Sequence, residues 1–210
     1  MEVEAARYEF DRAELLCTTH GLELDKNAVT IGRGWLEYEV AIVNEAGNLD
    51  KCEALLQMAY DRCQEVSQPF SHIEVLLALT WCAFFRGDHE MAERCLADAT
   101  SLANGTSYSQ LIAAVSVGRA ALAQSRGSLT IAQDLYKDAQ QLCKDSNSTQ
   151  WEANAYAGLT GIYFHQRRLR DSTWADKKAR RLAKRCGPMS TRLMQLSLSR
   201  SRQDSRFVPY

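Results

Sequence analysis

Apolar residues recur along this chain at the three- and four-residue spacing of amphipathic helices, not at the two-residue alternation of strands. Short polar loops, such as 66–69, 103–106 and 145–148, separate the periodic stretches. We expect helices at residues 8–20, 33–46, 49–65, 70–86, 89–103, 108–126, 129–145, 150–166, 169–186 and 189–201. The pattern therefore predicts an all-α protein, and a content of only 3 Pro and 11 Gly excludes a turn-rich all-β fold.

Four turn sites follow apolar helical stretches at a spacing of 40 residues, at Gly47, Gly87, Gly127 and Arg167. The same residue types recur at fixed places after each turn. Small residues stand at Cys52, Ala92, Ala132 and Ser172 and again at Ala59, Ala99, Ala139 and Ala179, with Leu56, Leu96, Tyr136 and Asp176 between them. These positions share one stripe of a helix, and small residues there allow a second helix to approach closely. The chain is therefore predicted to repeat a helix pair.

The segment Phe84–Glu93, with Gly87-Asp88 at its turn and Leu96 and Ala99 beyond it, resembles the tetratricopeptide repeat. The resemblance extends over residues 35–187. It departs from the family in its period of 40 residues, where about 34 is usual, in a largely missing first-helix motif, and in the absence of glycine at Arg167. It implies a right-handed superhelix that binds partners in a concave groove.

We therefore predict an α-solenoid of four to five antiparallel helix pairs, forming a single domain over residues 1–201 with a polar tail over 202–210. The opening helix reads as the second half of a repeat that lacks its first half. The helix at 189–201 is expected to cap the last apolar face, and the chain is interpreted as a part of a longer superhelix.

The first helix of each pair lines the groove in the tetratricopeptide family. The register of the turn sites then implies a set of groove residues, each of which could equally be a packing residue. They are Glu37, Asn44, Trp81, Phe84, Phe85, Gln124, Asn154, Phe164 and His165. Exposed Trp and Phe would be natural anchors for a partner helix or an extended peptide.

A second candidate surface is a basic patch on the helix 173–186 and the turn before it. Its members are Arg167, Arg168, Arg170, Lys177, Lys178, Arg180, Arg181, Lys184 and Arg185. On a helix, the six cations at 177–185 fall on one arc of about 160°. We consider three readings of this arc: a solvated face, a site for an acidic protein partner, and a site for nucleic-acid phosphates. No aromatic residue interleaves these six cations, which weighs against stacking of single-stranded bases.

Charge is unevenly distributed along the chain. Residues 1–100 hold 8 basic and 19 acidic residues, which leaves 17 of the 25 basic and 7 of the 26 acidic residues for 101–210. This asymmetry suits two partner surfaces of opposite charge, or head-to-tail self-association.

Enzymatic chemistry is not expected. The seven cysteines and four histidines show no zinc-ligand spacing, and no nucleophile or phosphate-loop motif occurs. The cysteines read as reduced core thiols, and the polar N-terminal residues contain no secretory signal. We therefore expect no metal or cofactor, no membrane association, and an intracellular location, cytoplasmic or nuclear.

The function predicted from the sequence is a protein–protein interaction scaffold or adaptor in a larger complex, holding a partner peptide or helix in the groove. The alternative is a subunit of a nucleic-acid-associated complex, for example a chromatin or cell-cycle assembly, contacting phosphates through helix 173–186. A structural subunit whose groove is permanently filled, and a regulator of bacterial signalling or transcription, also remain open.

Overall fold

The computed structural model describes residues 2–43, 49–187, 194 and 198, and all the regular secondary structure in them is helical. The helices are α1 (Glu2–His20), α2 (Glu23–Val43), α3 (Leu49–Glu65), α4 (Pro69–Arg86), α5 (His89–Asn104), α6 (Ser109–Ser125), α7 (Leu129–Asp145), α8 (Thr149–His165) and α9 (Leu169–Cys186). The all-α prediction is confirmed.

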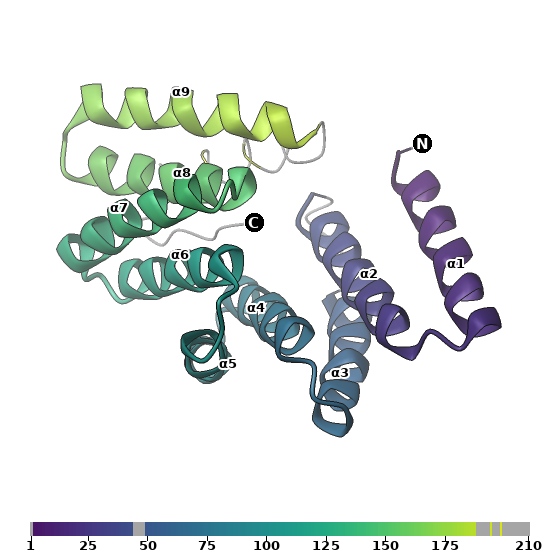
Figure 1. The fold of residues 1–210 in the computed structure, drawn as a ribbon. Coiled ribbons are helices and arrows are strands. Elements are labelled where there is room, and N and C mark those ends of the chain that lie inside the picture. The colour runs from purple at the N-terminus through teal and green to yellow at the C-terminus, as the bar shows by residue number, and fades with distance from the viewer. Residues whose placement is uncertain (1, 44–48, 188–193, 195–197, 199–210) are drawn as a thin grey trace.

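The helices stack as consecutive pairs (Figure 1). Helices α2 and α3, α4 and α5, α6 and α7, and α8 and α9 pack on each other within a pair. The inner helices α2, α4, α6 and α8 also contact one another in sequence, and α3, α5 and α7 each contact the inner helix of the following pair. The described chain is therefore an α-solenoid of four antiparallel pairs, preceded by α1, which packs on α2.

Three of the predicted turns have the same backbone geometry. Gly87 and Gly127 adopt φ values of 77° and 76°, in the left-handed region that glycine favours. Arg167 takes the same place with φ 61°, although its side chain makes this conformation costly. In each turn, two backbone N–H groups bond back to the end of the preceding helix, as at Gly87 N to Phe84 O (3.1 Å) and Asp88 N to Ala83 O (2.9 Å). The fourth predicted turn, at Gly47, lies outside the described residues.

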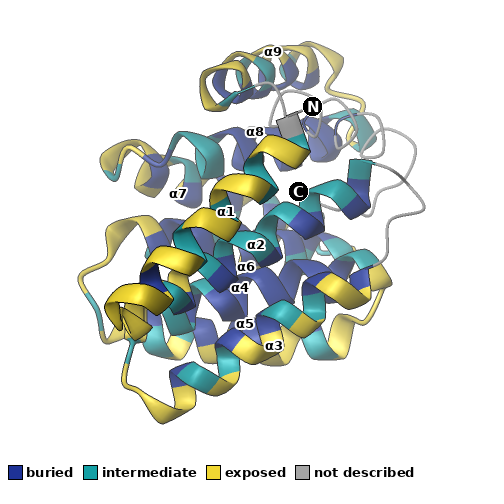
Figure 2. Cartoon of the chain, turned by 90° about the vertical axis from the view of Figure 1, so that its right-hand side faces the viewer, coloured by how far each residue is buried: buried dark blue, intermediate teal, exposed yellow. Residues whose placement is uncertain are grey.

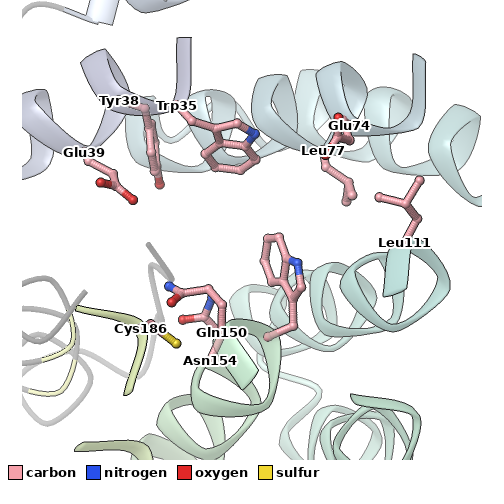
Figure 3. A pocket seen from close by; sticks show the side chains of 10 residues that line it. Trp35, Tyr38, Glu39, Glu74, Leu77, Leu111, Gln150, Asn154 and Cys186 are labelled. Carbon is pink, nitrogen blue, oxygen red and sulfur yellow. The ribbon is translucent and has the colours of Figure 1, made fainter. Parts of the chain in front are cut away.

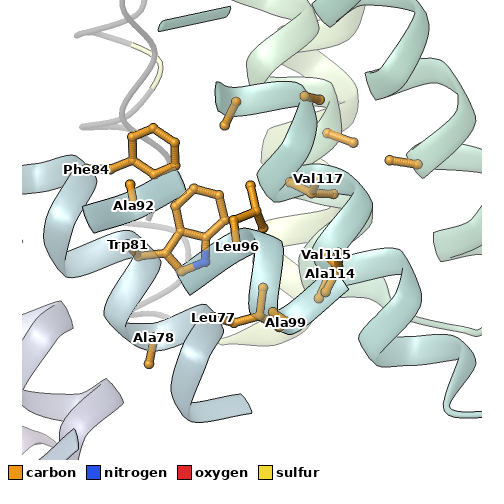
Figure 4. Close-up of a cluster of buried hydrophobic side chains, with 14 of the residues drawn as sticks. Leu77, Ala78, Trp81, Phe84, Ala92, Leu96, Ala99, Ala114, Val115 and Val117 are labelled. Carbon is orange, nitrogen blue, oxygen red and sulfur yellow. The ribbon is translucent and has the colours of Figure 1, made fainter. Parts of the chain in front are cut away.

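The repeated stripe is the packing surface between helices. Its eight small residues are all buried, and so are Leu56, Leu96 and Tyr136 between them. These larger side chains fit against glycines of the inner helices: a methyl group on Gly118 would lie 2.8 Å from Leu96 Cδ1, and one on Gly158 would overlap the Tyr136 ring. Leu96 and Ala99 meet the α4 side chains Leu77 and Trp81 in the same core (Figure 4). The sequence pattern thus marks where each pair docks on the next.

The predicted start of the second helix is wrong. The helix was predicted to begin at residue 33, but α2 begins at Glu23, so that Gly32 and Gly34 lie inside it. They serve close packing: a methyl group on Gly34 would lie 2.6 Å from Leu56 Cδ2. The turn lies instead at Gly21, with φ 67°. Helix α1 also begins six residues earlier than expected, at Glu2.

The predicted helix 189–201 falls mostly outside the described residues. Within it, Met194 and Leu198 are helical and fully buried. The predicted tail, 202–210, is not described.

Burial is greatest on the inner helices, and exposed residues line the outward face of α1 and α9 (Figure 2). Helix α4 buries all ten residues from Val75 to Phe84, and α8 buries all eleven from Ala153 to Tyr163. The two inner helices therefore have neighbours on every side. None of the described helices combines the length and the apolar character required to span a bilayer.

Candidate functional site

A partly open cavity of about 350 Å³ lies between the inner helices and the end of α9 (Figure 3). Its lining comes from five helices and therefore from all four pairs. The side chains are Trp35, Tyr38 and Glu39 of α2, Glu74 and Leu77 of α4, Leu111 of α6, Gln150, Trp151 and Asn154 of α8, and Cys186 at the end of α9. This volume lies at the lower end of the range of about 300–1,000 Å³ usual for ligand pockets.

Two half-buried tryptophans from opposite ends of the solenoid meet at this cavity. The ring of Trp35 on α2 lies edge-on to the ring of Trp151 on α8, with 6.3 Å between centroids. Trp35 also contacts Tyr38 at 5.8 Å, and Trp151 stacks on the buried Trp81 of α4 at 6.1 Å. A continuous aromatic chain thus joins the first, second and fourth pairs.

Two carboxylates stand at opposite ends of the cavity, with Trp35 between them in the view of Figure 3. Glu39 projects from α2 beside Tyr38, and Glu74 projects from α4 beside Leu77. Neither carboxylate has an ion-pair or hydrogen-bond partner in the described part of the chain. Burial raises the pKa of Glu39 and the pKa of Glu74, each to about 7. Both groups therefore change charge near neutral pH.

Most of the predicted groove residues are packed in the core rather than exposed. Trp81 and Phe84 stack on each other at 5.4 Å and are 0% and 4% exposed, so they cannot serve as exposed anchors. Gln124 and Asn154 are also buried, although Asn154 forms part of the cavity wall.

Phe85, Phe164 and His165 are half-buried at the ends of α4 and α8, away from the cavity lining. Asn44 lies outside the described residues. The predicted groove set is therefore corrected: among its described members, Asn154 alone lines the cavity. The physical reason is the curvature of the stack, which turns the inner faces of α4 and α8 into core.

Glu37 joins three helices instead of lining the cavity. Its carboxylate accepts hydrogen bonds from Arg7 Nη2 of α1 at 2.9 Å and from Lys51 Nζ of α3 at 2.7 Å. Burial alone would raise the pKa of Glu37, but the hydrogen bonds from Arg7 and Lys51 outweigh it, and the pKa lies below its ordinary value. Glu37 is thus an ionised packing residue that fixes α1 to the first pair.

Some cavity-lining residues occupy equivalent positions in the sequence repeat, so the sequence partly indicates where the cavity lies. Leu111 and Trp151 occupy equivalent positions before the turns at 127 and 167, and Glu74 and Asn154 occupy equivalent positions before the turns at 87 and 167. This stripe lies in the N-terminal half of the inner helices. The contribution of Trp35 and Glu39 has no such signal in the repeat, because it depends on the Trp35 ring of α2 reaching the Trp151 ring of α8.

The predicted basic patch is partly neutralised. Arg180 is paired with Asp176 at 2.9 Å, and Arg168 is paired with Asp171 at 2.6 Å and lies 4.4 Å from the Tyr163 ring centroid. Arg167 forms the turn after α8. The other cations make no ion pair within the described part of the chain. They are Arg170, Lys177, Lys178, Arg181, Lys184 and Arg185.

No aromatic residue interleaves the cations at 177–185, but one lies just before them on the same helix. Trp174 lies one turn before them on α9, is 50% exposed, and has Lys178 Nζ at 5.9 Å from its ring centroid. Its inner edge rests on Tyr156 of α8 at 5.4 Å. The patch is therefore a cationic stripe with one exposed indole.

The cysteines are free thiols. Six are buried as expected, whereas Cys186 is exposed beside the cavity. Cys52 Sγ and Cys82 Sγ lie 3.2 Å apart across α3 and α4, in hydrogen-bonding contact. Among the described residues, no group of three or more His, Cys, Asp and Glu side chains is arranged to hold a metal ion.

Comparison with known proteins supports the fold alone. No protein-family model and no curated protein sequence matches the chain. A solved structure, described as the crystal structure of BtubC (BKLC) from P. vanneervenii, superposes with a TM-score of 0.58 over 97% of this chain and 85% of that chain. The two sequences are 14% identical, so this chain is similar to BtubC in its helical architecture.

Proposed function

We propose that this chain is a non-enzymatic scaffold of the tetratricopeptide-like kind, which binds a segment of a partner protein on its concave side at the cavity described above. The observation that carries the proposal is that side chains from all four helix pairs converge on this one cavity. Helical solenoids commonly bind partners on such concave surfaces. A site built from four pairs also requires the whole stack to be folded.

The cavity has the composition of a binding site for a protein segment. Trp35 and Trp151 are half-buried, so they offer ring surface to a ligand while remaining anchored in the core. Partly buried tryptophans of this kind dominate the energetics of many interfaces. Gln150, Glu39 and Glu74 add polar groups that would orient the bound segment.

The test is capture of partners from a cell lysate by the native chain and by a variant with an obstructed cavity. Gln150→Arg places a long side chain at the cavity, and Gln141→Arg makes the same change on the exposed face of α7. We expect one or more partners to be retained by the native chain and by Gln141→Arg, and lost by Gln150→Arg. Equal capture by both variants would contradict a role for the cavity.

A second candidate function is the binding of a polyanion, either an acidic protein segment or nucleic acid, by the cationic stripe of α9. The specific observation in its favour is the set of cations near the exposed Trp174 that form no ion pair with any described residue. An indole beside cations suits stacking of a base as well as contact with phosphates.

A charge-reversal variant tests this candidate. Arg180 is left unchanged because it already pairs with Asp176. The variant carries Lys177→Glu, Lys178→Glu, Arg181→Glu and Lys184→Glu. We expect loss of binding to single-stranded oligonucleotides or to an acidic peptide, with steep salt dependence in the native chain. Salt-insensitive or absent binding by the native chain would leave α9 as a solvated face.

A further inference from the structure

The cavity holds two carboxylates that the fold partly removes from water, and no described residue supplies a cation beside them. Glu39 and Glu74 are each half-buried, on different helices, and neither has a charged or hydrogen-bonding partner in the described structure. Burying an ionised carboxylate without a partner is unfavourable. An arrangement that keeps two of them in one cavity therefore favours a ligand that brings positive charge.

The aromatic side chains that line the cavity also favour a cationic ligand. Trp35 and Trp151 present indole rings to the cavity, and an indole face attracts an ammonium or guanidinium group. The surrounding first half of the chain is acidic, with 19 acidic and 8 basic residues in 1–100. A cationic segment would therefore be attracted to this half before it contacts the cavity.

We propose that the cavity binds a basic side chain, arginine or lysine, from an extended segment of a partner protein. The cation packs against the indole of Trp35 or Trp151 where it faces the cavity, and pairs with Glu39 or Glu74. This inference rests on the proposed function and names the chemistry of the partner at the same site. A protein segment is favoured over a small free amine because the two carboxylates lie at opposite ends of the cavity, so that neighbouring basic residues of one segment can each reach one (Figure 3).

Binding should then depend on pH. Without a ligand, burial holds the pKa of both carboxylates near 7, so the cavity is mostly neutral at pH 6 and mostly ionised at pH 8. The other titratable groups in the lining are the Tyr38 hydroxyl on α2 and the Cys186 thiol on α9, whose pKa burial raises. No lysine, arginine, histidine or aspartate lines the cavity from α2, α4, α6, α8 or α9. Linkage predicts binding about tenfold tighter at pH 8 than at pH 6 for each carboxylate engaged.

The experiment uses the full chain and fluorescein-labelled hexa-arginine as the probe, followed by fluorescence anisotropy at pH 6 and pH 8. The test variant is Glu39→Gln/Glu74→Gln. The matched control is Glu65→Gln/Glu90→Gln, which removes the same charge from exposed positions on α3 and α5. Circular dichroism and thermal unfolding establish that both variants are folded. Labelled hexa-glutamate and unlabelled spermine are the comparison ligands.

We expect the native chain and the control to bind hexa-arginine with similar affinity and a clear gain at pH 8. The Glu39→Gln/Glu74→Gln variant should bind at least tenfold more weakly and lose the pH dependence. An equal loss of affinity in both variants would mean that the acidic residues of 1–100 attract hexa-arginine non-specifically. That result would overturn the inference.

Two further outcomes separate this inference from the proposed function. If Gln150→Arg abolishes partner capture while hexa-arginine fails to bind, the scaffold function stands. The inference that the cavity binds a basic side chain of the partner is then wrong. If spermine binds with the same dependence on Glu39 and Glu74 while hexa-arginine does not, the cavity takes a small amine and the assignment to a protein segment is wrong.

Discussion

Glu39 and Glu74 destabilise the fold in its unliganded form because their charged state is removed from water. Their carboxyl groups titrate near 4.5 in the unfolded chain and near 7 in the folded chain. Between these pH values the folded state binds more protons than the unfolded state, so stability falls as pH rises from about 5 to about 8. Below about pH 4 both states are protonated, and this contribution vanishes.

Replacing both carboxylates removes that penalty. Glu39→Gln/Glu74→Gln should raise the free energy of unfolding by about 2 kcal/mol per site at pH 8, after allowance for their partial exposure, and leave it nearly unchanged at pH 4. Urea unfolding at the two pH values measures the difference. The exposed pair Glu65→Gln/Glu90→Gln should change the free energy of unfolding by less than about 0.5 kcal/mol at either pH. A native-chain stability that rises between pH 5 and pH 8 in step with these groups would contradict this account.

Arg167 carries backbone strain that glycine carries without cost in the two preceding repeats. Its φ of 61° matches the turn conformation of Gly87 and Gly127. Arg167→Gly should therefore stabilise the chain by about 0.5–1 kcal/mol, since relief of the left-handed strain exceeds the added unfolded-state entropy of glycine. Thermal unfolding measures it. The converse change, Gly127→Ala, should destabilise the chain by about 1 kcal/mol, and stabilisation by that change would refute the reasoning.

Helix pairs are held together by large side chains that fit against glycines on neighbouring helices. Tyr136 of α7 is fully buried against Gly158 of α8, and Leu96 of α5 meets Gly118 of α6 in the same way. The ring of Tyr136 cannot move aside without disturbing the whole interface between the third and fourth pairs.

Gly158→Ala should consequently destabilise the chain by about 3 kcal/mol through overpacking. Gly105→Ala is the control, because Gly105 has a φ of −88° and a methyl group there would make only an ordinary contact with Leu102 O, at 3.5 Å. The double variant Gly158→Ala/Tyr136→Leu should be less destabilised than the sum of the two single changes, as measured by chemical denaturation. Strict additivity would show that the two residues do not share one contact.

The two ends of the solenoid differ in charge and in exposed apolar surface. Helix α1 exposes Tyr8, Leu15 and Leu16 within the acidic half, and α9 exposes Trp174 among cations at the other end. Because the solenoid is a stack, complementary end faces could extend it from one molecule to the next.

We therefore expect weak head-to-tail self-association at low salt. Sedimentation velocity at 50 mM and 500 mM NaCl should show concentration-dependent association at the lower salt and a monomer at the higher. The charge-reversal variant of α9 should remain monomeric at both, and so should Leu15→Glu/Leu16→Glu on α1. If the native chain is monomeric at every protein and salt concentration, the prediction of head-to-tail self-association is wrong.

Much of the fold follows from the sequence through local physics. Turn residues at a spacing of 40 and the stripe of small residues were enough to predict seven of the nine described helices to within one residue at each end, and the order in which the pairs stack. These features act between neighbours in the chain, where helical periodicity and backbone conformation decide the outcome. Likewise, the basic face of α9 follows from its own sequence.

The tertiary structure alone decided which inner-helix residues are accessible. Trp81, Phe84 and Gln124 have the register of groove residues, yet the curvature of the stack buries them. The same curvature brings Trp35 of α2 to Trp151 of α8, more than a hundred residues away, and so creates the cavity with Glu39 and Glu74. Small rotations between successive pairs accumulate over the whole array, and no local pattern records their sum.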